Sequence, residues 1–398
     1  MPSHPSTLAL RLLFPLALFS GCASNLLEPQ STVSKLRVLA VRAEPPDLAP
    51  GETVQLDALV VDPRHDRCLE AMTGGSGAPA ECLSPEVVGP PTLHWELCLF
   101  DQGATNLYRC GTIPDLPPEV TRRDLGSGAT ASIAYSAIVP DPAFIAQACS
   151  RLASADLPDF VEIPSCRRGL PVTIRLTAIA AGANLAGRTT DQFCLDEPSE
   201  CEIAKKSLTL LLPEKVGERN HNPRIEGLFN GGTELDPGVA IVPQCGDDSV
   251  PDEEDYGHHD PRVVPIVAAV SVGDGSGSSA ELFTPEPSQV DASPAPKREF
   301  LDIAWHSTFG GLRGATYWGD GLTTDDEITL NQLEFKQHMK EFNLTELPAG
   351  PVRIFAVIRD GRGGVDFREA EFSIPFISGS GNEVATDQQC FDVRGVAK

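Results

Sequence analysis

The sequence has little positive charge and no long apolar run beyond its first residues. Lys and Arg number 31 against 56 Asp and Glu in 398 residues, which gives a formal net charge of -25. A surface this acidic repels phosphate backbones, so nucleic acid is not expected as a partner. After residue 22, no apolar stretch approaches the roughly 20 residues that a membrane-spanning helix needs. Any membrane attachment is therefore expected to come from a lipid.

Motifs that carry chemistry are also missing. The sequence contains no P-loop, no H-E-x-x-H and no G-x-G-x-x-G after a strand. Residues 74–78 approximate the G-x-S-x-G nucleophile elbow, but they lie in a Gly-rich segment without the strand and helix that the elbow requires. No C-x-x-C pair is present, which argues against structural zinc. We therefore expect a protein that is not an enzyme and that uses no cofactor.

What is present begins with an export signal in residues 1–21. Arg11 and the amino terminus supply positive charge, and an apolar run follows at residues 12–19. The segment Leu18-Phe19-Ser20-Gly21-Cys22 resembles a bacterial lipobox, which implies that Cys22 is acylated and becomes the new N-terminus. An ordinary secretory signal, cleaved near Ala23, is the alternative.

The residue after Cys22 bears on the destination of the protein. Ala23 stands where proteobacterial sorting signals for the inner membrane have Asp, so by resemblance the protein is expected in the outer membrane, facing the periplasm or the cell surface. A triacylated N-terminus holds a protein firmly on a membrane, whereas one acyl chain does not. The membrane is thus a predicted partner, through the lipid.

The cysteines fit an exported protein. Removing Cys22 from the 11 cysteines leaves ten, an even number that is typical of disulfides. Short loops close most easily, so pairing between neighbours is expected. The neighbouring couples are Cys68 with Cys82, Cys98 with Cys110, Cys149 with Cys166, and Cys194 with Cys201. Cys245 and Cys390 remain, and a bridge between them would tie the C-terminal tail to the second half of the chain.

Many short segments alternate apolar and polar residues with period two, the pattern of half-buried strands. In one of them, Trp95 alternates with His94 and Glu96, and Trp305 has a similar place in the second half. The predicted strands are residues 35–43, 53–62, 93–99, 131–139, 172–178, 207–212, 224–229, 263–272, 301–305, 352–358 and 365–375. Residues 333–342 have helical spacing and predict one short helix.

This pattern predicts an all-β protein with two antiparallel β-sandwich domains of immunoglobulin-like (Ig-like) type, each with an inward-facing Trp. Long inserts between the strands are expected to be pinned by the disulfides. The predicted division is a tether at 22–34, domains at 35–213 and 224–376, and a tail at 377–398. The boundary falls in the polar, patternless residues 214–223.

Two segments carry a family resemblance. Residues 43–62, with two prolines, a turn at A-P-G-E and an alternating strand, look like the first two strands of bacterial Ig-like domains. Residues 352–367, which contain the turn R-D-G-R-G-G, are similar to the terminal hairpin of Ig-like or PKD-like modules in predicted lipoproteins of myxobacteria. The resemblance implies a fold and imports no catalytic residues.

Acidic clusters are the remaining candidates for chemistry. Residues 247–260 combine carboxylates and imidazoles, and the possible metal ligands among them are Asp252, Asp255, His258, His259 and Asp260. The segment lacks the EF-hand spacing and a helical i, i+4 histidine pair, so a solvated loop is the main interpretation. A second acidic segment, residues 320–327, lacks the order of a calcium loop and is interpreted as a turn.

These observations lead to one main functional hypothesis and two alternatives. The main one is a non-catalytic cell-envelope lipoprotein whose Ig-like domains serve adhesion, assembly or surface interaction. Its partner would be another envelope protein or a polysaccharide. The alternatives are an envelope hydrolase or carbohydrate-active protein with its site in the long inserts, and a metal- or solute-binding lipoprotein that uses residues 247–260.

Overall fold

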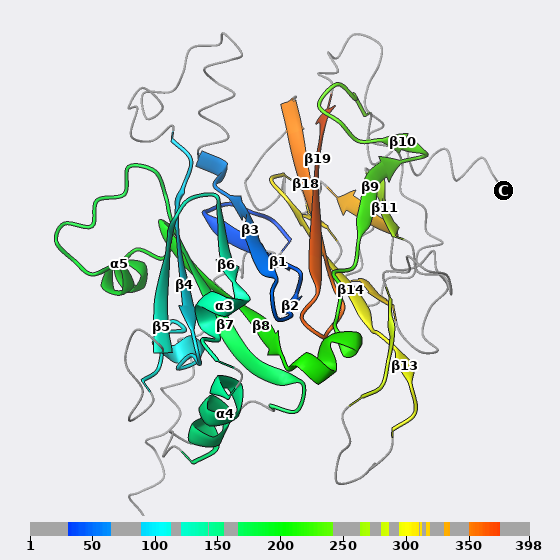
Figure 1. The fold of residues 1–398 in the computed structure, drawn as a ribbon. Coiled ribbons are helices and arrows are strands. Elements are labelled where there is room, and N and C mark those ends of the chain that lie inside the picture. The colour runs from blue at the N-terminus through cyan, green and yellow to red at the C-terminus, as the bar shows by residue number, and fades with distance from the viewer. Residues whose placement is uncertain are drawn as a thin grey trace, which may run out of the picture.

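A computed structural model of the chain describes residues 31–64, 89–112, 121–141, 143–154, 166–241, 263–270, 280–285, 294–309, 311–312, 316–318, 330–334 and 350–374. Most of the elements in these ranges are strands, which confirms the predicted all-β class. The main sheets form two pairs, one pair from the N-terminal part of the chain and one from the C-terminal part (Figure 1). We call residues 34–212 the first half, residues 224–374 the second half and residues 213–223 the linker.

The first half contains a three-stranded and a five-stranded sheet. The smaller has the order β1-β3-β6 and the larger the order β2-β8-β7-β4-β5. All pairings are antiparallel except that of β2 with β8, which is parallel. The strands are β1 (Arg37–Glu44), β2 (Asp47–Leu48), β3 (Thr53–Val61), β4 (Thr92–Cys98), β5 (Arg122–Ser127), β6 (Thr130–Ala134), β7 (Gly169–Ile179) and β8 (Cys201–Leu211).

One core fills the space between these two sheets. Trp95 of β4 is completely buried there, as the alternation of its strand predicts. Its indole Nε1 donates a hydrogen bond to Gly128 O at 2.8 Å, which satisfies the polar end of the ring. Val54 and Leu56 of β3 share this core with Leu176 of β7.

The second half repeats this construction. Its two main sheets have the orders β10-β9-β11-β17-β15 and β16-β14-β18-β19, and Trp305 of β14 is buried between them with Ile354 and Phe372. The strands are β9 (Ile225–Asn230), β10 (Thr233–Glu234), β11 (Val263–Val270), β14 (Leu301–Ser307), β15 (Gly311–Leu312), β16 (Thr316–Trp318), β17 (Leu330–Glu334), β18 (Gly350–Arg359) and β19 (Val365–Ile374), with a separate hairpin of β12 (Leu282–Phe283) and β13 (Lys297–Arg298).

The two halves pack directly on each other. The outer faces of β1 and β3 contact the outer faces of β18 and β19, where Leu39 and Leu59 meet Phe355, Val357 and Val365. The ladder between β1 and β3 shifts register near Leu39. A bulge of this kind re-aims side chains, so β1 contributes residues both to its own core and to this contact.

The N-terminal residues that the structure describes cross to the second half. Val33 N donates to Ser307 O and Ser307 N donates to Ser31 O, both at 2.8 Å. Thr32 and Val33 are only 2% and 1% exposed. The end of the segment predicted as a tether, residues 31–34, thus contains buried residues that belong to the structured part of the chain.

The described residues contain three disulfides, each between neighbouring cysteines as expected: Cys98–Cys110, Cys149–Cys166 and Cys194–Cys201. Cys98–Cys110 closes a loop after β4, Cys149–Cys166 joins α4 to the segment just before β7, and Cys194–Cys201 joins α5 to the first residue of β8. The remaining predicted partners, Cys68, Cys82, Cys245 and Cys390, lie outside the described residues.

One predicted strand is wrong at its end: the strand expected at 131–139 ends at Ala134, and the chain continues as α3 (Tyr135–Ile138). The first two residues of the helix expected at 333–342 belong instead to strand β17, and the rest of that segment lies outside the described residues. Three short α-helices of the described ranges were not predicted. The unpredicted helices are α3, α4 (Phe144–Ser154) and α5 (Thr190–Asp196). In the described ranges, no helix has the length and apolar character needed to cross a bilayer.

Candidate functional site

The residues that the sequence offers for chemistry lie mostly outside the described ranges. Cys22 is one of them, as are residues 74–78, 320–327 and the whole acidic segment 247–260 with its histidines. Within the described ranges, no group of three or more His, Cys, Asp or Glu side chains is placed to hold a metal ion. The site must therefore be sought among other residues, and the junction of the two halves is where buried polar groups gather.

Linker asparagines connect the two halves. Asn220 is completely buried, its backbone N donates to Asp47 Oδ2 at 2.8 Å, and its Nδ2 donates to Asp360 Oδ2 at 2.7 Å. Asn222 Nδ2 donates to Ala43 O, and Asn222 Oδ1 accepts from Val365 N, both at 2.8 Å. The linker, which reads as a patternless boundary in the sequence, is thus part of the junction.

A hairpin turn of the second half supplies the other side of this junction. Asp360 Oδ1 accepts from the backbone N of Arg362 at 2.7 Å and of Gly364 at 2.8 Å. Gly361 and Gly363 have φ of 72° and 106°, which confirms the tight turn with left-handed glycines that the sequence predicts between β18 and β19. The turn therefore holds the Asp360 carboxylate toward the linker.

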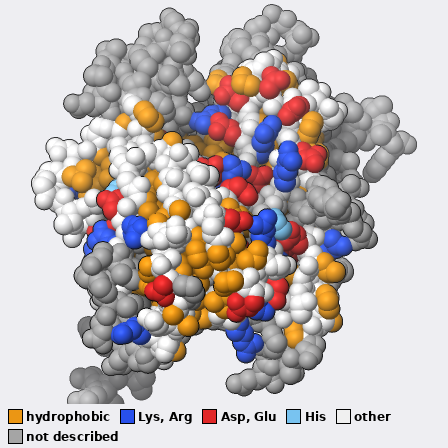
Figure 2. Space-filling model, in the orientation of Figure 1, with side chains coloured by type: hydrophobic (Ala, Val, Ile, Leu, Met, Phe, Trp, Pro, Cys, Tyr) orange, Lys and Arg blue, Asp and Glu red, His pale blue; other side chains and the backbone are white. Residues whose placement is uncertain are grey.

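Ion pairs surround the junction. Arg42 of β1 reaches Asp57 at 2.6 Å and Asp366 of β19 at 2.5 Å, and Asp366 also accepts from Ile225 N at 2.9 Å. Arg219 of the linker pairs with Glu52 at 2.9 Å. Figure 2 shows acidic and basic side chains next to each other where the two halves meet. The contact between the halves therefore combines apolar packing with ion pairs and hydrogen bonds, which require one relative orientation of the two halves.

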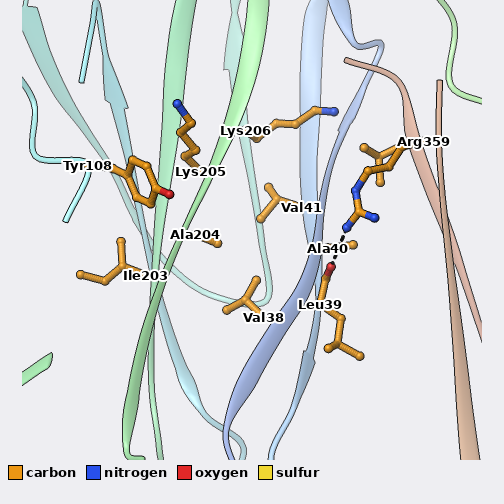
Figure 3. A pocket seen from close by; sticks show the side chains of 11 residues that line it. Val38, Leu39, Ala40, Val41, Tyr108, Ile203, Ala204, Lys205, Lys206 and Arg359 are labelled. Atoms are coloured by element: carbon orange, nitrogen blue, oxygen red, sulfur yellow. Dashed lines mark hydrogen bonds between the residues drawn. The ribbon is translucent and has the colours of Figure 1, made fainter. Parts of the chain in front are cut away.

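A cavity of about 290 Å³ lies beside this junction, between the edges of β1 and β8 (Figure 3). At its end, β8 pairs with β2 through Thr209 and Leu210. Before that point the neighbouring strand β1 pairs with β3 of the other sheet, so the edges of β1 and β8 are not hydrogen-bonded to each other and a space remains between them. Tyr108 closes one side, and Arg359 and Val365 of the second half close the other. The cavity is thus built from both halves.

Side chains satisfy two backbone groups on the β1 edge. Val38 N donates to Glu202 Oε2 at 2.7 Å, and Leu39 O accepts from Arg359 at 3.2 Å. Burial raises the pKa of Glu202, against the opposing effects of the Val38 N–H and of Arg37 and Lys35. The edge of β1 is therefore closed to a further strand, while the space beside it stays open.

Three cationic side chains line the cavity. Lys206 is 5% exposed, its Nζ donates to Gly363 O, and burial lowers its pKa to about 8 despite Asp360 and Asp47. Lys205 lies over the Tyr108 ring at 5.2 Å and has its nearest carboxylate, Asp101, at 3.6 Å. Lys205 and Lys206 are neighbours on β8, but the third cation, Arg359, comes from β18 more than 150 residues later, so sequence spacing gave no sign that it shares their site.

A buried carboxyl of the second half lies close to the same turn. Glu299 is 1% exposed, pairs with Arg362 at 2.6 Å and accepts from Glu281 N at 2.9 Å. Burial raises its pKa from 4.5 to about 7, and Asp360 adds to the rise, while the Glu281 N–H and Arg362 oppose it. His221 of the linker contacts Glu281 at 2.6 Å.

Glu299 predicts a loss of stability as the pH rises. Between about pH 5 and pH 7 the folded protein binds more protons at this group than the unfolded chain does, so the free energy of unfolding falls across that window by about 2 kcal/mol. We expect Glu299→Gln to flatten this slope in chemical denaturation series. All other titratable groups are the same in both proteins, so the difference between their slopes isolates Glu299. The exposed control Glu369→Gln should keep the slope, and an unchanged slope in Glu299→Gln would contradict the prediction.

A second buried polar cluster lies on the outer face of the five-stranded sheet. Glu96 accepts from Arg175 at 2.6 Å and from Arg122 at 2.8 Å, and Arg175 also pairs with Asp191. Burial by itself would raise the pKa of Asp191, but Arg175 and Arg109 hold it below its ordinary value. Arg175 Nε also donates to Leu107 O at 2.9 Å, so this cluster fastens the Cys98–Cys110 loop onto the sheet.

One contact resembles a hydrolytic triad and has a simpler explanation. His94 Nδ1 lies 3.3 Å from Ser127 Oγ, and His94 Nε2 lies 3.7 Å from Asp124. His94 and Ser127 are directly opposed in the β4–β5 ladder, which by itself brings their side chains together. Asp124 is 69% exposed and beyond hydrogen-bond distance, whereas a triad holds its acid buried and bonded. The contact is a cross-strand pair on an outer surface.

Comparison with known proteins leaves the family open. No family model and no curated protein matches the sequence. Alpha-2-macroglobulin from Escherichia coli overlays with a TM-score of 0.17 and 9% identity over 87% of this chain and 22% of that one. Three N-terminal domains of the bacteriophage RB49 highly immunogenic outer capsid protein overlay with a TM-score of 0.17 and 11% identity over 86% and 71%. The chain spans about a fifth of the first protein, and scores this low define neither fold nor function.

Proposed function

We propose that the protein is a non-catalytic cell-envelope lipoprotein whose two halves are Ig-like sandwiches that serve adhesion, assembly or surface interaction. One observation carries the proposal. Each half places a fully buried Trp on a strand with equivalent neighbours: β4 lies between β7 and β5, and β14 lies between β18 and β16. A buried Trp on the third main strand along the chain, strand C, is a mark of Ig-like domains.

The strand order supports the Ig-like assignment in more detail. In the usual Ig lettering, β1, β3 and β6 correspond to strands A, B and E, and β4, β7 and β8 to C, F and G. In the second half, β9, β11 and β17 correspond to A, B and E, and β14, β18 and β19 to C, F and G. In both halves a short segment after the first strand pairs in parallel with the last strand, at Asp47–Leu48 and at Ala240.

The first half departs from antibody domains in its described disulfides. Antibody domains join strands B and F across the core, whereas each described disulfide here joins neighbours in sequence. The local bridges hold the segments between strands, and the core depends on apolar packing. This arrangement is consistent with a secreted module that displays long loops on a stable frame.

The junction supports a rigid pair of modules. Its apolar contact and the ion pair of Arg42 with Asp366 join first-half to second-half residues, and the linker asparagines bond to both halves. Linked domains that lack a large apolar contact are expected to move relative to each other, so this contact favours a fixed arrangement. A partner would therefore meet one composite surface.

The start of the described chain also places the lipid in this proposal. Ser31 is held on the second half, and eight residues separate it from Cys22. A chain of that length spans at most about 30 Å. A lipid on Cys22 would thus hold the second half near the membrane surface, which we propose is the outer membrane.

Site-specific cross-linking in cells tests the interaction role. A photoreactive amino acid would replace Leu195 of the first half or Leu282 of the second, which are 56% and 66% exposed apolar side chains. We expect at least one position to give a discrete adduct with an envelope protein or polysaccharide, identified by mass spectrometry. Glu226, an exposed polar position on β9, is the matched control. Absence of a discrete adduct at both apolar positions would contradict an interaction through these surfaces.

A further inference from the structure

We propose that the cavity between β1 and β8 binds a small organic carboxylate with a short alkyl body. Lys206 and Arg359 would hold the carboxylate, and Val38, Val41 and Ile203 would pack against the alkyl part. The inference concerns the described residues alone and does not depend on the envelope placement proposed above.

The charges around the cavity favour an anion. Among the described residues, no carboxylate lies within ion-pair distance of the Lys206 Nζ, although that side chain is 95% buried, and Gly363 O is its one described hydrogen-bond acceptor. Arg359 has its nearest carboxylate, Asp302, at 3.7 Å. The carboxylates that act on this ammonium, Asp360 and Asp47, lie beyond ion-pair distance. Burying an ammonium without a close counter-ion is costly, so an anion at this position would complete the site.

The rest of the lining favours an apolar body over a bare inorganic ion. Most lining residues are aliphatic, with Val38 and Val41 on β1, Ile203 and Ala204 on β8, and Val365 on β19. Figure 3 shows these side chains around the space, with Lys206 and Arg359 extending from opposite strands. At about 290 Å³ the cavity is at the lower end of the range for ligand pockets, which limits the ligand to a short chain.

The position of the cavity gives the ligand a structural consequence. Lys206 and Val41 belong to the first half, whereas Arg359 and Val365 belong to the second. A carboxylate between Lys206 and Arg359 would replace repulsion between two nearby cations by attraction to both. Binding should therefore stabilise the junction of the halves, because a ligand that prefers the folded state raises its stability.

An inward-facing lysine has another known use in β proteins. Lys206 lies in the part of β8 before Thr209, which pairs with β7 on one side and with no described strand on the other. Charged residues that point inward protect such strand edges from pairing with other chains. That role requires the charge but no ligand, and it predicts no binding. The two explanations are therefore separable by experiment.

Calorimetric titration of the purified chain with sodium hexanoate tests the proposal, with neutral hexanamide as the matched probe. We expect saturable binding of hexanoate at one site, a rise in thermal midpoint, and binding of hexanamide weaker by at least about tenfold, since a charge-assisted contact is lost. Lys206→Met should weaken hexanoate by a similar factor. Lys297→Met removes an exposed lysine far along the chain and should leave binding unchanged.

A second variant keeps the test valid if Lys206→Met fails to fold. Ala204→Leu adds bulk to the cavity without altering any charge, and we expect it to lose hexanoate binding while its circular dichroism is retained. Equal binding of hexanoate and hexanamide would overturn the anion site. Absence of saturable hexanoate binding would overturn the proposed site, and full binding by both variants would show that hexanoate binds outside this cavity. In either case, protection of the β8 edge would remain as the role of Lys206.

Discussion

Cells that produce the Cys22→Ser variant are expected to release the protein from their membranes into the soluble periplasm or the medium. The variant lacks the thiol that a lipobox implies is acylated, and apart from that lipid no attachment is expected, because the sequence after residue 22 contains no spanning stretch. Membrane fractionation with immunoblotting measures the shift, which should approach completeness. Labelling with an alkyne fatty acid should mark the native protein and leave the variant unmarked.

A conservative change close to Cys22 provides the control. Ser24→Ala alters a nearby small residue without touching the thiol and should leave the protein in the outer-membrane fraction. Unchanged membrane retention of Cys22→Ser, together with no acylation of the native protein, would exclude the lipoprotein assignment. An ordinary secretory signal cleaved near Ala23 would then be the remaining explanation.

Glu96→Gln is expected to lower the free energy of unfolding of the first half by about 3 kcal/mol. Removing one member of a buried ion pair leaves its partner charged and desolvated, which typically costs about 3 to 5 kcal/mol. Glu96 is 2% exposed and accepts hydrogen bonds from both Arg175 and Arg122. Because Arg175 keeps its ion pair with Asp191 after the change, we expect the lower end of this energy range. Denaturation followed through the fluorescence of Trp95 would measure the loss.

The exposed partner of the same carboxylate is the matched control. Arg122 has 62% of its side chain exposed, and exposed ion pairs contribute at most about 1 kcal/mol, so Arg122→Gln should have a small effect. Similar losses in both variants would show that burial does not set the strength of this cluster. A loss near zero in Glu96→Gln would show that Arg175 is adequately paired by Asp191.

The strands were the part of the fold that the sequence predicted well. The alternation around Trp95 and Trp305 correctly assigned both residues to cores, because a period of two places every second side chain on one face of a sheet. The pattern failed where it was weakest. Residues 135–138 continue an apolar strand pattern in the sequence, yet they form helix α3, in which Tyr135 and Ile138 are buried.

The missed helices have a physical explanation. In α4, Phe144, Ile145, Ala148 and Leu152 are buried, a helical spacing, but in the sequence they fall inside the insert 141–169, which contains Cys149 and Cys166. In α5 the Thr189 side chain accepts from Gln192 N at 3.2 Å, a cap that is common in loops as well as at helix starts. Such short helices depend on the disulfide and the sheet beside them more than on their own propensity.

The sequence by itself predicted the all-β class, the buried tryptophans and the three disulfides of the described residues, because each depends on residues close together in the chain. The export signal stays a prediction. Only the tertiary structure decided which polar residues are buried. Glu96 stands on the polar side of its strand and would be exposed there, but the Cys98–Cys110 loop covers it. Lys206 and Asn220 become a buried site only because the second half packs against the first, and contacts between distant segments leave no periodicity in the sequence.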